Sequence, residues 1–234
     1  MPTEPSVGQW LQQQRNILWL AGALLVASCE RNESVDNAGN ASPDIAAEEY
    51  VAPDPGFIKN PGFSREGGDI AEWSMIQHAG EKSFDYTTEA GVLTITRTDI
   101  QPWGMIRQSL DRKDTKPLQG KTLEFSAELS ASLNDEFGAA LDPSGLRVRI
   151  KGVKRGSPAM LGTAILLTDD QAIAGTKGDL PWQRYALQFK VPAETEASNL
   201  SIELSVMLAS GGSIAVRGPA LQEVAATGDI TSGQ

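Results

Sequence analysis

Residues 122–131 read TLEFSAELSA, and this stretch decides the fold class. Apolar side chains occupy every second position (Leu123, Phe125, Ala127 and Leu129), and the polar side chains of Glu124, Ser126 and Glu128 lie between them. A period of two is typical of a strand with one buried face and one solvated face, as in an antiparallel sheet. The stretch therefore predicts a β-strand that covers one side of a hydrophobic core.

The same alternation recurs along the chain after residue 57. It is clearest at 145–153, 184–192 and 199–209, and shorter candidates cover 91–97, 104–110, 160–168 and 213–217. Turn-forming sequences rich in Gly, Pro, Asp and Ser lie at 118–121, 142–145, 176–179 and 210–213,. We find no pattern for a long amphipathic helix in this region. Eight or more strands predict an all-β domain, a jelly-roll β-sandwich, over residues 57–234.

The N-terminal segment has a different character. Residues 16–27, NILWLAGALLVA, form an apolar run that follows Arg15. The run is shorter than the roughly 20 residues of a membrane span, and it is typical of a secretory signal peptide. The small residues Ala27 and Ser28 then precede Cys29, the only cysteine. A single cysteine excludes an internal disulfide framework and a thiolate metal cluster.

The stretch Val26-Ala27-Ser28-Cys29 resembles the bacterial lipobox. The resemblance implies that residues 1–28 are a signal peptide, that cleavage occurs before Cys29, and that Cys29 is acylated, with palmitate as a testable label. Each buried methylene contributes about 0.8 kcal/mol, so several acyl chains anchor firmly where one does not. Glu30 rather than Asp follows the cysteine, which by resemblance to bacterial sorting favours the outer membrane of the cell envelope. The alternative is a free cysteine in a secreted protein.

Residues 29–56 are expected to form an acidic, disordered tether after the lipidated cysteine. From Glu30 to Asp54 there are seven acidic residues against one basic residue. Such a segment buries too little apolar surface to offset the entropy lost on ordering. The whole chain has 20 Lys and Arg against 30 Asp and Glu, a formal net charge of −10. This balance argues against nucleic acid as a partner, because phosphate backbones are bound by clustered cations.

Five stretches of the domain occur together in a distinctive order. They are Asn60-Pro61-Gly62-Phe63 with the later Trp73, the segments 91–95, 103–108 and 118–127, and Trp182-Gln183-Arg184-Tyr185. Over roughly residues 57–225 this order resembles the jelly-roll carbohydrate-binding modules of the cellulose- and xylan-binding type, which have a galactose-binding-like β-sandwich. The resemblance implies a binding module whose partner is a polysaccharide or another envelope glycan.

The resemblance also bears on metal binding. In that family the last strand carries an aspartate that helps to hold a structural calcium. The corresponding stretch here reads Ala215-Val216-Arg217-Gly218-Pro219 and lacks it. We interpret the loop acids Asp142, Asp169 and Asp170 as solvated, so neither a metal nor another cofactor is expected.

The sequence favours a protein that is not an enzyme. It has no Gly-x-Ser-x-Gly elbow, phosphate-binding loop or His-rich zinc motif,. The single histidine, His78, is expected to be a surface or packing residue rather than a general base. Glu124 and Glu128 share a strand face, but four residues of strand span roughly 13 Å, whereas the two carboxyl groups of glycoside hydrolases lie about 5 to 9.5 Å apart.

We expect those two glutamates to pair instead with cations of a neighbouring strand, namely Arg147, Arg149 or Lys151,. The strand at 145–153 presents these three cations on one face, opposite Leu146, Val148 and Ile150.

One group of residues is a candidate ligand site. Trp103 follows Gln101-Pro102 at the entrance to the strand 104–110, where its ring can stand free. Arg107 has the same parity as Trp103, while Gln108 points to the other face. Tyr86, in the polar stretch 83–87 that we interpret as a loop, is the expected second aromatic residue. Trp103, Arg107 and Tyr86 together predict a shallow glycan site, while Trp73, Trp182 and Tyr185 are expected in the core or at its rim.

Two functions remain open. The first is a lipid-anchored, non-catalytic carbohydrate-binding module of the cell envelope. The second is an envelope structural or interaction lipoprotein whose jelly roll binds a protein partner or peptidoglycan. Only 6% of the residues are aromatic, which is few for a sugar-binding platform that must also supply a core. Two or more aromatic side chains exposed around one surface would favour the first function.

Overall fold

The computed structural model describes residues 50–138, 142–157, 163–173 and 177–225. The predicted signal peptide, Cys29 and most of the predicted tether therefore lie outside the described residues. In the part of the chain that the structure describes, no helix has the length and apolar composition required to cross a membrane.

Twelve strands and two short helices follow one another along the described chain. The first half contains β1 (Arg65–Glu66), β2 (Asp69–Ile70), β3 (Ser74–Gln77), β4 (Phe84–Glu89), β5 (Val92–Arg97), β6 (Gly104–Leu110), α1 (Arg112–Thr115) and the 3-10 helix η2 (Lys116–Leu118). The second half contains β7 (Thr122–Asn134), β8 (Gly145–Lys154), β9 (Ala164–Ala172), β10 (Gly178–Lys190), β11 (Ala197–Leu208) and β12 (Gly211–Glu223).

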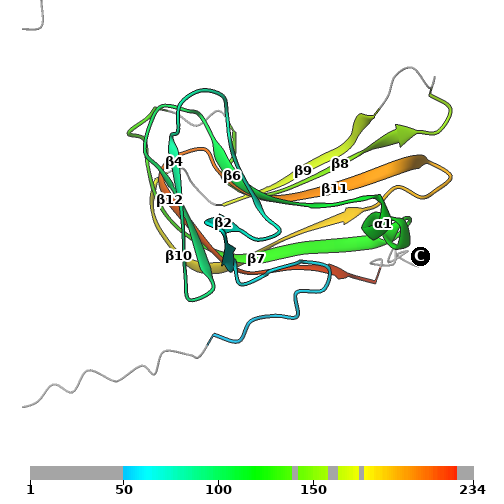
Figure 1. Cartoon of the computed structure of the whole chain (residues 1–234), viewed down its shortest axis with the longest axis horizontal. Coiled ribbons are helices and arrows are strands. Elements are labelled where there is room, and N and C mark those ends of the chain that lie inside the picture. Colours follow the sequence, from blue (N-terminus) through cyan, green and yellow to red (C-terminus); the bar gives the residue numbers. More distant parts are fainter. Residues whose placement is uncertain (1–49, 139–141, 158–162, 174–176, 226–234) are drawn as a thin grey trace, which may run out of the picture. The chain divides into compact units, whose positions relative to one another are not determined.

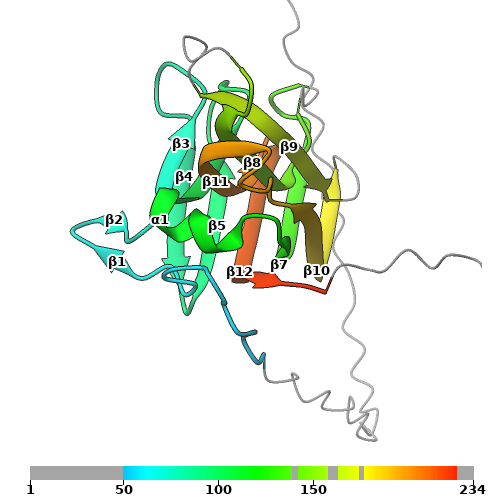
Figure 2. The ribbon, with the colours of Figure 1, turned by 90° about the vertical axis from the view of Figure 1, so that its right-hand side faces the viewer.

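Ten of these strands form two antiparallel sheets that face each other (Figure 1). The first sheet has the order β10-β7-β12-β5-β4, and the second has the order β3-β6-β11-β8-β9. The strands β1 and β2 form a separate small hairpin. Figure 2 shows α1 at one end of the sandwich, where Thr115 donates from its hydroxyl to the carbonyl oxygen of Leu200 at 2.8 Å. The predicted all-β jelly-roll sandwich is confirmed.

The core lies between the two sheets and follows the predicted alternation. On β7 the side chains of Leu123, Phe125 and Leu129 are buried, and on β11 those of Ile202, Leu204 and Val206 are buried. Burial of apolar area at about 25 cal/mol per Å² is the main term that holds the sheets together. The alternate side chains of every central strand consequently point outward, and these outward side chains build the two outer faces of the sandwich.

Two strand predictions need correction. The stretch 83–87 is not a loop: Phe84–Glu89 forms β4, in which Phe84 and Tyr86 face inward and Asp85 and Thr87 face outward. The strand expected at 160–168 is β9 at Ala164–Ala172, and its side chains are mostly exposed. An edge strand with little burial has no clear alternation, so its limits cannot be located from the pattern.

The chain around residues 54–57, where the domain was expected to begin, also contacts the sandwich. The backbone N–H of Phe57 donates to Leu221 of β12 at 3.0 Å, and the N–H of Leu221 donates to Pro55 at 3.1 Å. The side chain of Gln222 donates to the carbonyl oxygen of Asp54 at 2.9 Å. The last residues of the segment that we assigned to the tether therefore pack on the first sheet.

Candidate functional site

An open pocket lies on the outer face of the second sheet. Its volume is about 340 Å³, at the lower end of the range of roughly 300–1,000 Å³ for small-molecule sites. The lining residues come from β3, β6, β8, β11 and the segments beside them: Ile76, Trp103, Met105, Arg107, Asp142, Arg147, Arg149 and Glu203. Trp103 and Arg107 of the predicted site therefore share one pocket.

Strand register brings the lining residues together. In one row across the second sheet, Arg107 of β6 lies opposite Ser205 of β11, which lies opposite Arg147 of β8. In the next row Glu203 of β11 lies opposite Arg149 of β8. Because side chains alternate between the faces, these residues all point outward while their neighbours enter the core.

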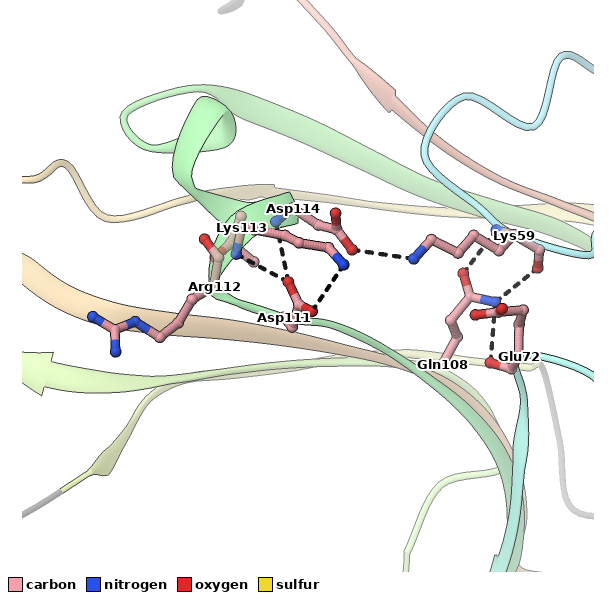
Figure 3. Close-up of polar contacts among 8 residues, drawn as sticks. Lys59, Glu72, Gln108, Asp111, Arg112, Lys113 and Asp114 are labelled. Atoms are coloured by element: carbon pink, nitrogen blue, oxygen red, sulfur yellow. Dashed lines mark hydrogen bonds and ion pairs between the residues drawn. The ribbon is translucent and has the colours of Figure 1, made fainter.

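Gln108, the neighbour of Arg107 on β6, points to the opposite face of the sheet. Gln108 points inward and is 3% exposed. Its side-chain oxygen Oε1 accepts from the backbone N–H of Lys59 at 2.9 Å, and its side-chain Nε2 donates to the backbone carbonyl oxygens of Lys59 and Glu72 (Figure 3). Lys59 in turn forms an ion pair with Asp114 of α1 at 3.2 Å. Gln108 therefore binds the chain around Lys59 and Glu72 to the second sheet and is not available to a ligand.

Glu203 lies at the centre of the charged residues of the pocket. Its side chain is only 12% exposed. Its carboxylate lies 2.6 Å from Nζ of Lys151, 3.4 Å from Nη1 of Arg107 and 3.9 Å from Nη1 of Arg149. A buried carboxylate requires such partners, because an uncompensated buried charge is strongly destabilising. Three cations thus surround one anion.

Arg147 is held by two other acids. Its guanidinium donates to Asp170 of β9 and to Asp142, the latter at 3.3 Å. Burial acts to lower the pKa of Arg147, but the hydrogen bonds and charges of Asp170 and Asp142 outweigh it and raise the pKa above its ordinary value. Arg147 therefore has its own counterions and fixes the wall of the pocket.

Trp103 forms the aromatic part of the pocket. It is half-buried just before β6, and its ring meets the ring of His78 edge-on, with centroids 5.8 Å apart and planes at 84°. The backbone N–H of His78 donates to the carbonyl oxygen of Trp103 at 3.0 Å, and Nδ1 of His78 lies 3.0 Å from Oε1 of Gln101. His78 is thus a surface residue that contacts the edge of the indole ring.

Tyr86 does not line this pocket. It belongs to β4 of the first sheet, and its hydroxyl donates to the carbonyl oxygens of Ile76 and Met105 at 2.9 and 3.2 Å. Burial raises the pKa of Tyr86 to about 12. Since Ile76 and Met105 are lining residues, Tyr86 supports the pocket from behind, and its predicted role as an exposed ring beside Trp103 is wrong.

The expected partners of the two glutamates on β7 are also wrong. Glu124 accepts from Arg184 at 2.6 Å and from Gln188 at 2.9 Å, both on β10. The hydrogen bond from Gln188 and the pairing with Arg184 lower the pKa of Glu124. Glu128 pairs with Arg217 of β12 at 2.6 Å.

These pairs form because β10 and β12 flank β7 in the first sheet. Arg147, Arg149 and Lys151 belong to the second sheet, where Glu203, Asp142 and Asp170 are their partners. The alternation at 145–153 indicated a wet face with three cations, but the strand order that brings Glu203 and Arg149 into the pocket could not be predicted from it.

The remaining aromatic candidates lie elsewhere. Trp73 is buried, and its ring lies 5.3 Å from that of Phe63. Tyr185 packs against the core. Trp182 is 38% exposed on the first sheet, where the guanidinium of Arg217 lies 4.4 Å from its ring and 3.8 Å from the ring of Tyr50. The exposed Trp182 and the half-buried Trp103 are therefore on opposite sheets, and the pocket contains one aromatic ring.

Potential metal ligands are scattered. Among the described residues, no group of three or more His, Cys, Asp and Glu side chains could hold a metal ion. Of the three acids that we interpreted as solvated loop residues, Asp169 and Asp170 lie in β9, and Asp142 and Asp170 contact Arg147, so these two are not free solvated groups.

Comparisons with known proteins found similar chains among solved structures. No protein-family model matches the sequence, and no match was found among curated proteins. Among solved structures, a CBM4 module is similar with a TM-score of 0.41 and 17% identity, over 71% of this chain and 99% of that chain. The xylan-binding CBM22-1 domain of Paenibacillus barcinonensis Xyn10C is similar with a TM-score of 0.42 and 14% identity, over 70% and 92%.

A third similar structure is the enzymatically active domain of tailspike protein 4 of bacteriophage CBA120. Its TM-score is 0.43 and its identity is 14%, over 73% of this chain. The chain spans only 22% of that tailspike structure.

Proposed function

We propose that this protein is a non-catalytic carbohydrate-binding module that holds a glycan in the pocket of the second sheet. The observation that carries the proposal is the presence of a fixed indole ring and fixed polar groups in one open pocket. Trp103 supplies the ring, and Arg107, Arg149 and Glu203 supply the polar groups.

This combination suits the chemistry of a sugar ring. A pyranose presents C–H groups on its faces and hydroxyl groups around its rim. The face of Trp103, with Ile76 and Met105 beside it, offers apolar contact area. The guanidinium groups present several N–H donors in a planar fork, and Glu203 offers an acceptor. Trp and Arg are also enriched among the side chains that contribute most to binding at protein–protein interfaces.

The carboxylates of the pocket are arranged for structure rather than hydrolysis. Glu203 is enclosed by Lys151, Arg107 and Arg149, and Asp142 pairs with Arg147. Canonical glycoside hydrolysis needs two carboxyl groups that flank the scissile bond, one as acid and one as nucleophile or base. Two carboxylates held by four cations favour a binding role.

We place this module at the bacterial cell envelope. The apolar run 16–27 and the lipobox-like Val26-Ala27-Ser28-Cys29 support acylation of Cys29, and Glu30 supports the outer membrane. Labelling of cells with an alkyne palmitate is expected to mark the wild-type chain and not Cys29→Ala. Equal labelling of both would show that Cys29 is not acylated.

Two tryptophan variants test the binding site. The full chain, purified in detergent, is applied to a glycan array that includes neutral and acidic polysaccharides. We expect Trp103→Ala to abolish binding to every glycan that the wild type retains, with little change in melting temperature. Trp182→Ala is the matched control, because Trp182 is exposed on the opposite sheet.

Three results would contradict the proposal. They are an array on which the wild type retains nothing, a Trp103→Ala variant that binds like the wild type, and a Trp182→Ala variant that alone loses binding.

A further inference from the structure

The charges in the pocket do not balance around Glu203. Lys151, Arg107 and Arg149 all contact this one carboxylate. Arg147 contacts two other acids, Asp170 and Asp142, so its own group carries one negative charge in excess. Among the described residues, the group around Glu203 therefore carries two positive charges in excess, and the two groups together carry one.

The excess is located on Arg107 and Arg149. Lys151 makes the short contact to Glu203, at 2.6 Å, whereas the two arginines make longer ones, at 3.4 and 3.9 Å. The Nε atoms of Arg107 and Arg149 are buried, and neither has a hydrogen-bond partner among the described residues. A guanidinium has five N–H donors, so each of these arginines has further donors besides the buried Nε and its contact to Glu203.

Both arginines can be reached from solvent. Their side chains are 32% and 33% exposed, and both line the pocket beside Trp103. They extend from β6 and β8, on either side of β11. A group held between them would lie above Glu203 and within the pocket.

We infer that the glycan bound here is acidic, and that Arg107 and Arg149 together bind its carboxylate or sulfate group. This inference rests on the proposed glycan site. A carboxylate is a planar acceptor and a sulfate is a tetrahedral one, and both accept hydrogen bonds from the N–H groups of a guanidinium. Such charge-assisted hydrogen bonds are about twice as strong as neutral ones. A neutral sugar would leave the positive excess around Glu203 uncompensated.

The rest of the protein is acidic, so attraction of an anion is confined to this pocket. The chain carries a formal net charge of −10, so an anionic polymer gains no general attraction to it. Binding of such a polymer would therefore depend on the pocket, and it would weaken with salt because the contacts are partly exposed.

Polymers that differ only in charge test the inference. The full chain in detergent is titrated with polygalacturonate, with the same polymer after reduction of its carboxyl groups, and with dextran sulfate beside neutral dextran. We expect binding to at least one of the two acidic polymers, and affinity at least about tenfold lower for its neutral counterpart, the effect of about one charge-assisted hydrogen bond. Which acidic polymer binds distinguishes a carboxylate from a sulfate ligand.

Arginine variants connect the charge effect to the pocket. We expect Arg107→Gln and Arg149→Gln each to weaken binding of the acidic polymer at least about tenfold. Lys151 still pairs with Glu203 in both variants. The control is Arg184→Gln, which removes an exposed arginine from the first sheet and is expected to leave binding unchanged.

The outcomes separate the two proposals. Equal or stronger binding of the neutral polymers, lost in Trp103→Ala, would overturn the inference and leave the glycan site standing. Absence of binding to all four polymers and to the glycan array would overturn both. Acidic binding that Arg184→Gln weakens as much as Arg149→Gln would also overturn the inference. If the glutamine variants unfold, the comparison of acidic and neutral polymers on the wild type decides it.

Discussion

Tyr86 shows how one side chain of the first sheet supports a pocket on the second. Its hydroxyl donates to the carbonyl oxygens of Ile76 on β3 and Met105 on β6. Both strands belong to the second sheet, and both residues line the pocket. The phenol therefore crosses the core to hold the edge of the sheet on which Trp103 and Arg107 are mounted.

Replacement of Tyr86 by Phe tests this role through the pH dependence of stability. Its pKa is about 12 in the folded protein against an ordinary value of 10.0. The folded state favours the neutral phenol. The contribution of Tyr86 to the free energy of unfolding is therefore complete below pH 10 and is lost as the pH rises towards 12.

We expect Tyr86→Phe to be less stable than the wild type by about 1 kcal/mol at neutral pH, from the lost hydrogen bonds. The difference should narrow above pH 10 and change sign as the pH approaches 12, as measured by urea unfolding of both proteins. A difference that stays constant through this range would contradict the assignment.

Part of the candidate site could be predicted residue by residue. The parity of Trp103 and Arg107 followed from the strand pattern alone, because alternation assigns each residue to a face. Arg149 and Glu203 could not be placed beside them, because they come from strands far apart in the sequence that only the sheet order makes neighbours. Tyr86 was misplaced because the polar residues around it suggested a loop.

At the scale of the elements, β6 depends on close packing at its first residue. A Cβ atom on Gly104 would come within 2.4 Å of the ring of Phe84, which is 1% exposed and cannot move away. β6 can therefore lie this close to Phe84 only because its first residue is glycine. This close approach sets the position of Trp103 immediately before the strand.

We expect Gly104→Ala to destabilise the protein by about 1 to 3 kcal/mol, the usual cost of overpacking a core. Glycan binding should weaken as well, because Trp103 would be displaced. The matched control is Gly62→Ala, where a Cβ atom meets no atom within 4 Å; its effect should stay within about 0.5 kcal/mol. Thermal unfolding of the two variants checks this, and equal melting temperatures would contradict it.

The strands differed in how well they could be predicted. β7, β8 and β11 are long and buried on one face, so their alternation is clear in the sequence. β4 and β9 lie at sheet edges, where fewer neighbours bury the strand and the polar side chains lose their regular spacing. Fold class depends mainly on the long alternating strands, which explains why it was predicted correctly although β4 and β9 were not.

At the scale of the whole molecule, the domain should fold without its N-terminal segment. We expect a fragment of residues 57–234 to give a mainly β circular-dichroism spectrum and a cooperative melt, since both sheets lie within it. A fragment of residues 50–234 should melt at a higher temperature, because Asp54 and Pro55 contact β12. A helical spectrum, or aggregation that ends only when residues 30–56 are restored, would contradict this expectation.

The contacts of Tyr50 and Pro55 with the first sheet also have a mechanical consequence. A pull on the N-terminal end of the described chain reaches the sandwich through the stack of Tyr50 on Arg217 and the pairing of Gly56 with Leu221, both on β12. β12 is hydrogen-bonded to β7 on one side and to β5 on the other. The load is therefore resisted first by shearing of β12, an interior strand, before it reaches Lys59 and its hydrogen bonds to the sheet that carries the pocket.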